Sequence, residues 1–297
     1  MTAKKILITG KNGQLGCELQ NLCPDEFEMV AMARKELDIS NSSAVLKAVE
    51  QAQPDIIINA AAYTAVDRAE QEREAAFSVN ARGAENIALA CKQVGARFIH
   101  VSTDFVFDGK KSSPYIVSDK RNPLGVYGAS KAEAEAVVQK ILPESVIVRT
   151  AWVYSAHGNN FANTMLRLMA ERDELAVVAD QVGTPTWTGT IAEVLFALAR
   201  KEQAQGIYHC TDLGVASWYD FAVAIYEEGK SNGLLPANKE LAIKAITTQD
   251  YPTPAQRPSY SVLDKSRLLN DLDVDLRNWR ESLRQVFSSK AQKLKAY

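Results

Sequence analysis

The sequence lacks long apolar runs and paired cysteines. None of its apolar stretches approaches the roughly 20 residues that cross a membrane, and the short run at residues 6–8 is too short for a signal peptide. The cysteines form neither a CxxC pair nor a spacing typical of a metal site: Cys17, Cys23, Cys91 and Cys210. We therefore expect reduced thiols in a cytoplasmic protein that has no membrane partner.

Neither sign of charge is in excess. The chain has 34 Lys and Arg against 36 Asp and Glu, a formal net charge of -2 over 297 residues. Because this balance gives no general attraction to nucleic acid or to an anionic membrane, any anionic ligand must be held locally. The length suits one large domain, or a large and a small one that share an interface.

Short apolar runs alternate with helix-length amphipathic segments in the first half of the chain. The runs are nearly continuous in Ile, Val, Leu and Ala, as in parallel strands covered on both faces. We predict strands at 5–9, 28–31, 55–59, 97–102 and 145–150. Helices are predicted at 14–22, 42–52, 75–94 and 127–140. This order predicts an α/β fold with a doubly wound parallel sheet of the Rossmann type.

From Ala151 onward, apolar runs and amphipathic segments alternate less regularly. Helices are predicted at 160–172, 191–201 and 218–228, between loops rich in Gly, Asn, Pro and Thr. The prolines of segment 251–258 forbid helix and central strand there. We therefore assign residues 1–150 to a dinucleotide-binding domain and 151–297 mainly to a smaller substrate-binding region, some of whose segments can return to the first sheet.

Glycines at a fixed spacing follow the first predicted strand. Gly10, Gly13 and Gly16 form a GxxGxxG pattern, which differs from the GxGxxG of the standard dinucleotide fingerprint. Glycine lets the backbone approach a pyrophosphate, and the helix that follows offers unpaired N–H groups. Tight turns also use glycine for purely structural reasons. The position between a strand and a helix favours a phosphate-binding loop.

The end of the second strand carries cations where NAD-binding proteins carry a carboxylate. Arg34 and Lys35 stand there, and the first carboxylate is Glu36. Since an acidic residue suits the ribose 2′-hydroxyl and a basic one suits a 2′-phosphate, the segment favours NADPH over NADH. The alternative is a solvated surface pair, with NADH also accepted.

Tyr127 and Lys131 stand at i and i+4 at the start of a predicted helix, so they share one face. A neighbouring ammonium stabilises a phenolate and makes tyrosine a better acid–base catalyst. Upstream, Ser102 and Thr103 end the fourth predicted strand, where a hydroxyl can hydrogen-bond a substrate carbonyl. The alternative is that Tyr127 merely begins a helix and Lys131 is solvated.

These features, in this order, resemble the extended short-chain dehydrogenases and, within them, the dTDP-4-dehydrorhamnose reductase family. The similarity runs over nearly the whole chain. It rests on segments 13–16 (GQLG), 37–39 (LDI), 59–67 (NAAAYTAVD), 102–107 (STDFVF), 126–128 (VYG), 149–152 (RTAW), 158–161 (GNNF), 180–186 (DQVGTPT) and 257–258 (RP), with Ser261.

The resemblance implies reduction of a nucleotide-linked keto-sugar at C4, with hydride from NADPH. Tyr127 would donate the proton, Lys131 would hold both Tyr127 and the cofactor ribose, and Thr103 would assist. The implied cofactor-binding residues are Gly10, Gly13, Gln14, Leu15, Asp38, Ile39, Ala61, Ala62, Tyr63, Thr64, Tyr127 and Lys131. The implied substrate-binding residues are Thr103, Asp104, Trp152, Asn160 and Arg257, the last as a diphosphate clamp or else a surface arginine.

Two positions depart from the family pattern. Phe105 stands where a tyrosine is expected, which removes one possible hydroxyl to the sugar. Some members dimerise through magnesium held by glutamates; Glu18 matches one of these, but segment 188–190 offers no carboxylate. We therefore expect no metal site, and a monomer or a homodimer of another form.

Three further interpretations stay open. The family includes a non-catalytic, NADP-binding regulatory subunit, although an intact Thr103, Tyr127 and Lys131 argue against that class. A nucleotide-sugar epimerase or dehydratase is the second alternative, against which the missing carboxylate at Ala33 argues. Asn80 resembles the helix asparagine that supports a proton-relay water, but a role in bending the helix fits it too.

Overall fold

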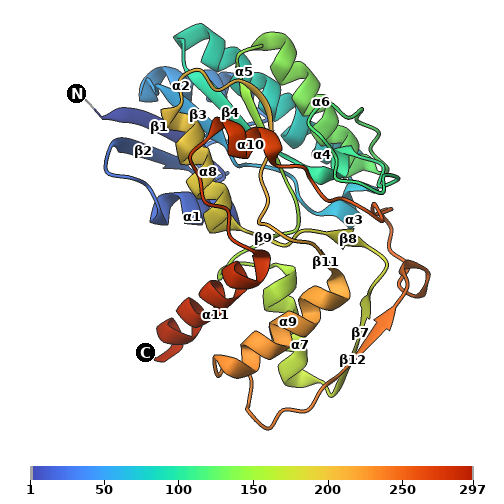
Figure 1. Cartoon of the computed structure of the whole chain (residues 1–297). Helices are drawn as coiled ribbons and strands as arrows, with labels where there is room; N and C mark the ends of the chain where they lie inside the picture. Colours follow the sequence, from blue (N-terminus) through green and yellow to red (C-terminus); the bar gives the residue numbers. More distant parts are fainter. Residues whose placement is uncertain (1–2, 296–297) are drawn as a thin grey trace.

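A six-stranded parallel sheet forms the centre of the larger part of the molecule (Figure 1). The computed structural model describes residues 3–295; residues 1–2 and 296–297, at the outer ends of the two predicted regions, lie outside it. In spatial order the strands are β2 (Phe27–Met32), β1 (Lys4–Thr9), β3 (Ile56–Asn59), β4 (Arg97–Thr103), β5 (Val146–Thr150) and β10 (Gly206–His209). The strand order reverses at β1, which creates a crevice at the carboxyl ends of β1 and β3.

Helices cover both faces of this sheet, so the predicted doubly wound α/β fold is confirmed. On one face lie α2 (Ser42–Ala52), α5 (Gly83–Val94) and α6 (Val126–Ile141). On the other lie α1 (Gln14–Asn21), α8 (Thr188–Arg200) and α10 (Ser266–Asp271). Successive strand residues point to opposite faces, so Ile6 and Ile8 join one apolar core and Leu7 the other.

The helix predicted at 75–94 is in fact interrupted. The structure has α4 (Arg73–Phe77), a π-helical turn η1 (Ser78–Arg82) and then α5. The wider turn carries Asn80, whose side chain binds the backbone of Tyr63, and a regular helix would place that side chain differently.

The remaining elements build a second layer below the sheet in Figure 1. Its core is formed by α7 (Phe161–Glu171), α9 (Trp218–Ser231), α11 (Trp279–Lys295) and the parallel pair β7 (Glu174–Val178) and β12 (Ala242–Ile246). Short elements complete it and the crevice: α3 (Val66–Ala69), η2 (Asp104–Val106), β6 (Val153–Tyr154), β8 (Val182–Gly183), β9 (Thr186–Trp187), β11 (Ala216–Ser217) and η3 (Thr248–Asp250).

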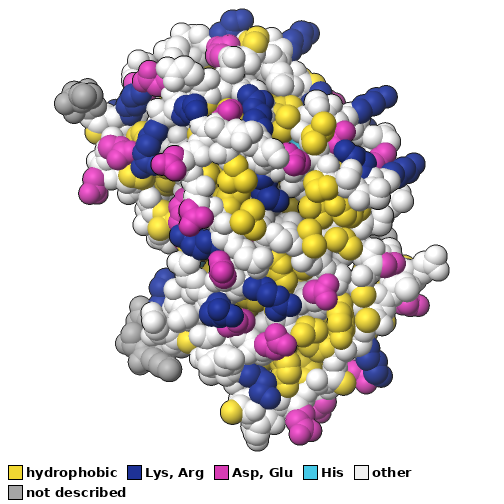
Figure 2. Space-filling model, in the orientation of Figure 1, with side chains coloured by type: hydrophobic (Ala, Val, Ile, Leu, Met, Phe, Trp, Pro, Cys, Tyr) yellow, Lys and Arg dark blue, Asp and Glu magenta, His cyan; other side chains and the backbone are white. Residues whose placement is uncertain are grey.

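The later half of the chain also returns to the first sheet. β10 pairs with β5, and both α8 and α10 pack on the sheet's second face. None of the helices within residues 3–295 combines the length and the apolar character needed to cross a membrane. On the face seen in Figure 2, acidic and basic side chains are interspersed, as the near-zero net charge implies.

Candidate active site

The glycine loop lies in the crevice between β1 and β3. Gly10 has a φ of +79°, and a Cβ there would lie 2.8 Å from the backbone carbon of Ala60. A Cβ on Gly16 would lie 2.1 Å from the carbonyl oxygen of Gly10. Gly13 precedes α1 and provides no side-chain cap, so the first N–H groups of the helix are free to bind an anion. Gln14 and the buried Leu15 begin that helix.

The end of β2 holds more charge than the sequence analysis singled out. Arg34 and Lys35 are exposed there, as expected for groups that receive a phosphate. Glu36 turns back to accept the Ala33 N–H at 2.7 Å, and Lys11 of the glycine loop lies 3.8 Å from its carboxylate. Lys11 is therefore a further cation on this side of the crevice.

The two sides of the crevice, which the family resemblance assigns to adenine and nicotinamide, are fixed by hydrogen bonds. Asp38 accepts both the N–H and the hydroxyl of Ser40, which hold the pKa of its carboxyl below the ordinary value. Ile39 is buried against Gly83. These contacts keep the loop after β2 in one conformation.

Asn80 secures the opposite wall. Its side chain accepts the Tyr63 N–H at 2.8 Å and donates to the Tyr63 carbonyl at 3.1 Å and to Ser130 Oγ at 2.9 Å. Half-buried Ala61, Ala62 and Tyr63, with exposed Thr64, are thereby held beside α6. In this structure Asn80 positions a loop, in addition to bending the helix.

Tyr127 lies at the start of α6 beside Thr103 and Asp104. Its ring meets that of Phe105 edge-on, with 5.5 Å between centroids. Burial raises the pKa of Tyr127 to about 12; the Thr103 hydroxyl opposes this shift, and the charge of Asp104 adds to it. The phenol is therefore protonated at neutral pH, which is the state that a proton donor needs.

Asp104 is a buried carboxylate, and one of its two oxygens lacks a hydrogen bond. Its Oδ1 accepts the Thr103 hydroxyl at 3.0 Å, whereas Oδ2 makes no hydrogen bond of normal geometry among residues 3–295; the Ser261 hydroxyl lies near enough to the carboxylate to lower its pKa, against burial. Burial raises the pKa of Asp104 to about 6. A buried oxygen without a partner is costly unless a ligand completes it, so Oδ2 marks a place for a polar group of a substrate.

Lys131 contacts strand β4 in this structure. Its Nζ donates to the Val101 carbonyl at 2.7 Å and lies 3.2 Å from His100 Nε2. Burial lowers the pKa of Lys131 to about 8. The contact with Tyr127 that the family resemblance implies is absent among the hydrogen bonds of the described chain, because Nζ is held on the buried side of α6. The pKa of Tyr127 is accordingly raised, not lowered.

Trp152 has a strained backbone, with a φ of +45°. Its indole is stacked on that of Trp218, with centroids 3.5 Å apart and planes 3° apart. Asn160 caps α7 through the Asn163 N–H and donates to Gln14 Oε1 at 2.8 Å, which ties the substrate-binding region to the phosphate loop. Trp218 had no role in the sequence analysis.

Arg257 already has an anionic partner. Its guanidinium binds Asp67 with two hydrogen bonds, at 2.8 and 3.1 Å, and also donates to the Ala255 carbonyl. The pair joins α3 to the proline-rich segment 251–258. A diphosphate would therefore compete with Asp67 for this arginine.

Glu18 faces the interior of the chain. It is buried and accepts the Thr188 hydroxyl at 3.2 Å. Within residues 3–295, no group of three or more His, Cys, Asp or Glu side chains is arranged to hold a metal ion. The expectation that the protein has no metal site stays a prediction.

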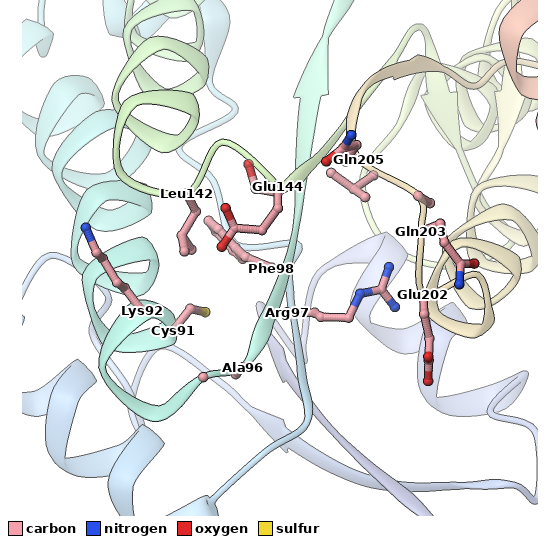
Figure 3. A pocket seen from close by; sticks show the side chains of 14 residues that line it. Cys91, Lys92, Ala96, Arg97, Phe98, Leu142, Glu144, Glu202, Gln203 and Gln205 are labelled. Atoms are coloured by element: carbon pink, nitrogen blue, oxygen red, sulfur yellow. The ribbon is translucent and has the colours of Figure 1, made fainter.

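A cavity of about 450 Å³ lies at the amino-terminal ends of the strands, opposite the glycine loop (Figure 3). It opens where β4 and β5 begin, and Arg97 and Glu144 contribute to its lining. The Arg97 guanidinium donates to the carbonyls of Leu198, Ala199 and Lys201, so its hydrogen bonds are used within the fold. The candidate site residues Thr103, Asp104 and Tyr127 lie instead at the carboxyl ends of the strands.

His100 and the buried pair Glu135–Arg149 were missed by sequence reasoning. His100 stands between Ile99 and Val101, and Arg149 follows the apolar residues 146–148; the two side chains are 0% and 1% exposed. Because a buried polar group needs a partner, such isolated residues are the signal that could have found them.

Known proteins are similar to this chain in sequence. A family model described as the RmlD substrate binding domain matches residues 4–292. The dTDP-4-dehydrorhamnose reductase of Aggregatibacter actinomycetemcomitans is 45% identical over 289 residues, which cover 95% of this chain and 98% of that one.

Solved structures agree with that match. A dTDP-4-dehydrorhamnose reductase from Bacillus anthracis str. Ames, in complex with NADP, is 38% identical with a TM-score of 0.90, covering 96% of this chain and 99% of the other. One from Clostridium acetobutylicum is 41% identical with a TM-score of 0.89, covering 99% and 100%. The chain therefore belongs to the dTDP-4-dehydrorhamnose reductase family.

Proposed function

We propose that this chain reduces the C4 keto group of dTDP-4-dehydro-L-rhamnose to give dTDP-L-rhamnose, with NADPH as hydride donor. It is an NAD(P)H-dependent oxidoreductase. The observation that carries the finer proposal is the half-buried, protonated Tyr127 beside Thr103 and the unpartnered oxygen of Asp104, next to a glycine loop suited to a pyrophosphate.

NADPH, when bound, supplies the hydride. Gly13 and the first turn of α1 bind the pyrophosphate, and Arg34 with Lys11 faces the 2′-phosphate. Loop 61–64, held by Asn80, forms the nicotinamide wall. Tyr127 donates its proton to the oxygen at C4 as charge develops there, while Thr103 hydrogen-bonds the same oxygen. Asp104 Oδ2 accepts a hydroxyl of the sugar.

Trp152 and Arg257 complete the substrate side in this proposal. The Trp152 indole, fixed by Trp218, offers a flat apolar surface for the sugar. Arg257 exchanges Asp67 for the diphosphate, since a guanidinium binds both kinds of anion through paired N–H groups. The reaction would take place in the cytoplasm, in a monomer or a homodimer.

One incubation separates this proposal from its rivals. Purified protein is mixed with NADPH and dTDP-4-dehydro-L-rhamnose, and products are identified by mass spectrometry. A reductase forms dTDP-L-rhamnose with equal oxidation of NADPH. A regulatory binding protein forms no product, and an epimerase or dehydratase converts sugar without net oxidation of the cofactor; either result would refute the proposal.

Arg34→Asp is expected to abolish or reverse a preference for NADPH over NADH. The substitution places a carboxylate where the cation at the end of β2 faces the 2′-phosphate. The measurement is kcat/KM with each cofactor, and Arg167→Asp on the distant helix α7 is the control. Equal kcat/KM for the two cofactors in the wild type would show that Arg34 has no such role.

Removal of divalent metal is expected to leave activity and oligomeric state unchanged. The reason is that Glu18 is committed to Thr188 inside the chain. Activity and light scattering are measured with and without a chelator. Loss of either on chelation, restored by magnesium, would contradict the prediction.

A further inference from the structure

A chain of buried polar side chains crosses the carboxyl ends of three strands and ends at Lys131. Thr9 Oγ donates to Asn59 Oδ1 at 2.6 Å, and Asn59 Nδ2 lies 3.1 Å from His100 Nδ1. His100 Nε2 lies 3.2 Å from Lys131 Nζ. These side chains are 0–2% exposed, so they are shielded from bulk solvent. The network connects β1, β3 and β4 to α6.

The hydrogen bonds fix which nitrogen of His100 carries the proton. The Ala61 N–H, which can only donate, points to Asn59 Oδ1 at 3.2 Å. The amide nitrogen of Asn59 therefore faces His100 and donates to Nδ1. A neutral imidazole with Nδ1 as acceptor carries its proton on Nε2. That N–H points at Lys131 Nζ.

An ammonium group cannot accept this hydrogen bond, because it has no lone pair. A neutral amine can, and it still donates to the Val101 carbonyl at 2.7 Å. We infer that His100 is a positioning residue that holds Lys131 as a neutral amine in the cofactor-free protein at moderately alkaline pH, and that Lys131 takes up a proton from solvent when NADPH binds. The inference rests on the proposed contact between Lys131 and the cofactor ribose.

Cofactor binding supplies the reason for proton uptake. The ribose hydroxyl oxygens accept from Nζ and draw it away from the His100 N–H. The phosphates of NADPH place negative charge in the same crevice, which favours the charged amine. Lys131 thus becomes an ammonium beside Tyr127 when a substrate can react.

The charges around Lys131 agree with a neutral amine. Glu135, one turn along α6, acts on it, but this carboxylate already binds Arg149 and Ser102. Asp104 of η2 acts on Tyr127. The nearby carboxylates of the α3–α4 segment are committed elsewhere: Glu70 to the Val126 N–H, Glu72 to the Tyr63 hydroxyl and Glu74 to Arg82.

Burial also lowers the pKa of both partners. The pKa of Lys131 falls to about 8, and that of His100 falls well below its ordinary value, chiefly through burial. At about pH 9 the free protein then holds mostly neutral Lys131.

Nitrogen NMR of the histidines tests the tautomer without any variant. The chain has three histidines, of which His157 is exposed and His100 and His209 are buried. His209 Nδ1 faces the Asp264 carbonyl, so its proton is on Nδ1. The cofactor-free protein is expected to show one buried histidine of each tautomer. Two buried histidines that both carry the proton on Nδ1 would overturn the inference.

Calorimetry of NADPH binding at about pH 9, in buffers of different ionisation enthalpy, counts the protons. The Tyr127→Phe protein is used, which removes the tyrosine as a second titrating group. We expect uptake of about one proton per NADPH, lost in Lys131→Met. Absence of uptake would overturn the inference.

Asn59→Asp provides the matched control, because it keeps both His100 and Lys131. A carboxylate accepts from His100 Nδ1, which leaves Nε2 as an acceptor for a charged Lys131. Proton uptake should then disappear and the NMR tautomer should invert; unchanged uptake would overturn the inference. A wild-type protein that does not bind NADPH would instead contradict the proposed function, and the tautomer measurement would still decide the inference.

Discussion

Replacement of Tyr127 by phenylalanine is expected to lower kcat for the keto-sugar by about 10²–10⁴-fold, the usual contribution of a positioned general acid. The oxygen at C4 needs a proton as hydride arrives, and Thr103 can assist it only by hydrogen bonding. Tyr127 is half-buried and protonated, with a pKa raised to about 12. Its ring packing on Phe105 survives the substitution, so NADPH affinity should change little.

Single-turnover oxidation of NADPH measures this effect apart from product release. Tyr208→Phe is the control, because it also removes a tyrosine hydroxyl, one that donates to Asp271 at the far strand β10. Near-wild-type turnover by Tyr127→Phe would refute the proposed mechanism, and Tyr127 would then have only a structural role at the start of α6.

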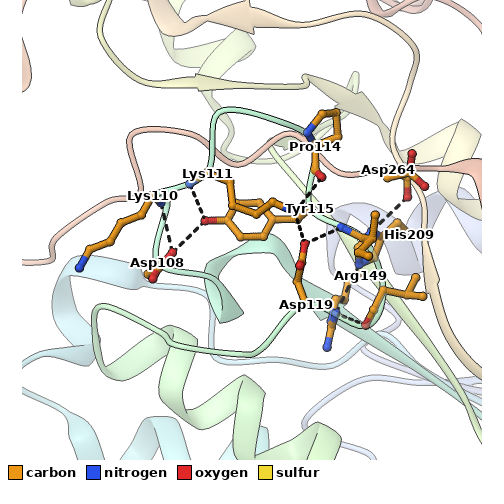
Figure 4. A network of polar contacts seen from close by, with 11 residues as sticks. Asp108, Lys110, Lys111, Pro114, Tyr115, Asp119, Arg149, His209 and Asp264 are labelled. Carbon is orange, nitrogen blue, oxygen red and sulfur yellow. Dashed lines mark hydrogen bonds and ion pairs between the residues drawn. The ribbon is translucent and has the colours of Figure 1, made fainter.

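Arg149→Met is expected to lower the free energy of unfolding by about 3 kcal/mol, because the buried carboxylate of Glu135 keeps only the Ser102 hydroxyl and the partly exposed Arg121 as partners. Arg149 Nε and Nη2 bind the two oxygens of Glu135 at 2.9 and 2.7 Å, and both side chains are at most 1% exposed. Arg149 also donates to the Val117 carbonyl and lies 3.4 Å from His209 (Figure 4). The network thus joins β5 to α6, β10 and the loop at 108–122.

The double variant Arg149→Met/Glu135→Leu is the critical comparison. Replacing both charges by apolar groups of similar volume removes the buried carboxylate that has lost its main partner, so most of the lost stability should return. Denaturant unfolding, followed by circular dichroism, gives both values. If Arg149→Met is as stable as the wild type, the Glu135–Arg149 pair does not contribute to the free energy of unfolding.

Burial favours a raised pKa for Glu135, but the hydrogen bonds and charge of Arg149 hold it below the ordinary value. A carboxyl with a lowered pKa stabilises the fold at neutral pH, and that contribution is lost as the pH falls through the acidic range. The wild type should therefore lose more stability on acidification than the double variant does.

Local pattern was enough to predict the fold. The strand at 5–9 and the helix at 42–52 are found within one residue of their predicted bounds, because apolar periodicity is decided by neighbours in the chain. The glycine loop was predicted for the same reason. The π-helical turn at Asn80 was not, since it depends on a hydrogen bond to Tyr63, 17 residues away.

The sequence could not predict which side chains the charged site residues contact. Arg257 meets Asp67 across 190 residues, and Lys131 meets His100 across 31. Such pairs depend on which strand ends lie together and which lone pairs remain free. The roles of Tyr127, Lys131, Arg34 and Arg257 stay predictions that the proposed experiments test.

The pairing of β10 with β5 has a consequence for synthesis on the ribosome. Strand β5 is complete at Thr150, yet its outer neighbour begins only at Gly206. Until then the nascent chain exposes an apolar strand edge, and α8 and α10 have not covered the second face. Such edges template aggregation. A product that ends near residue 150 is therefore expected to be insoluble, and the sheet closes only after residue 209 has emerged.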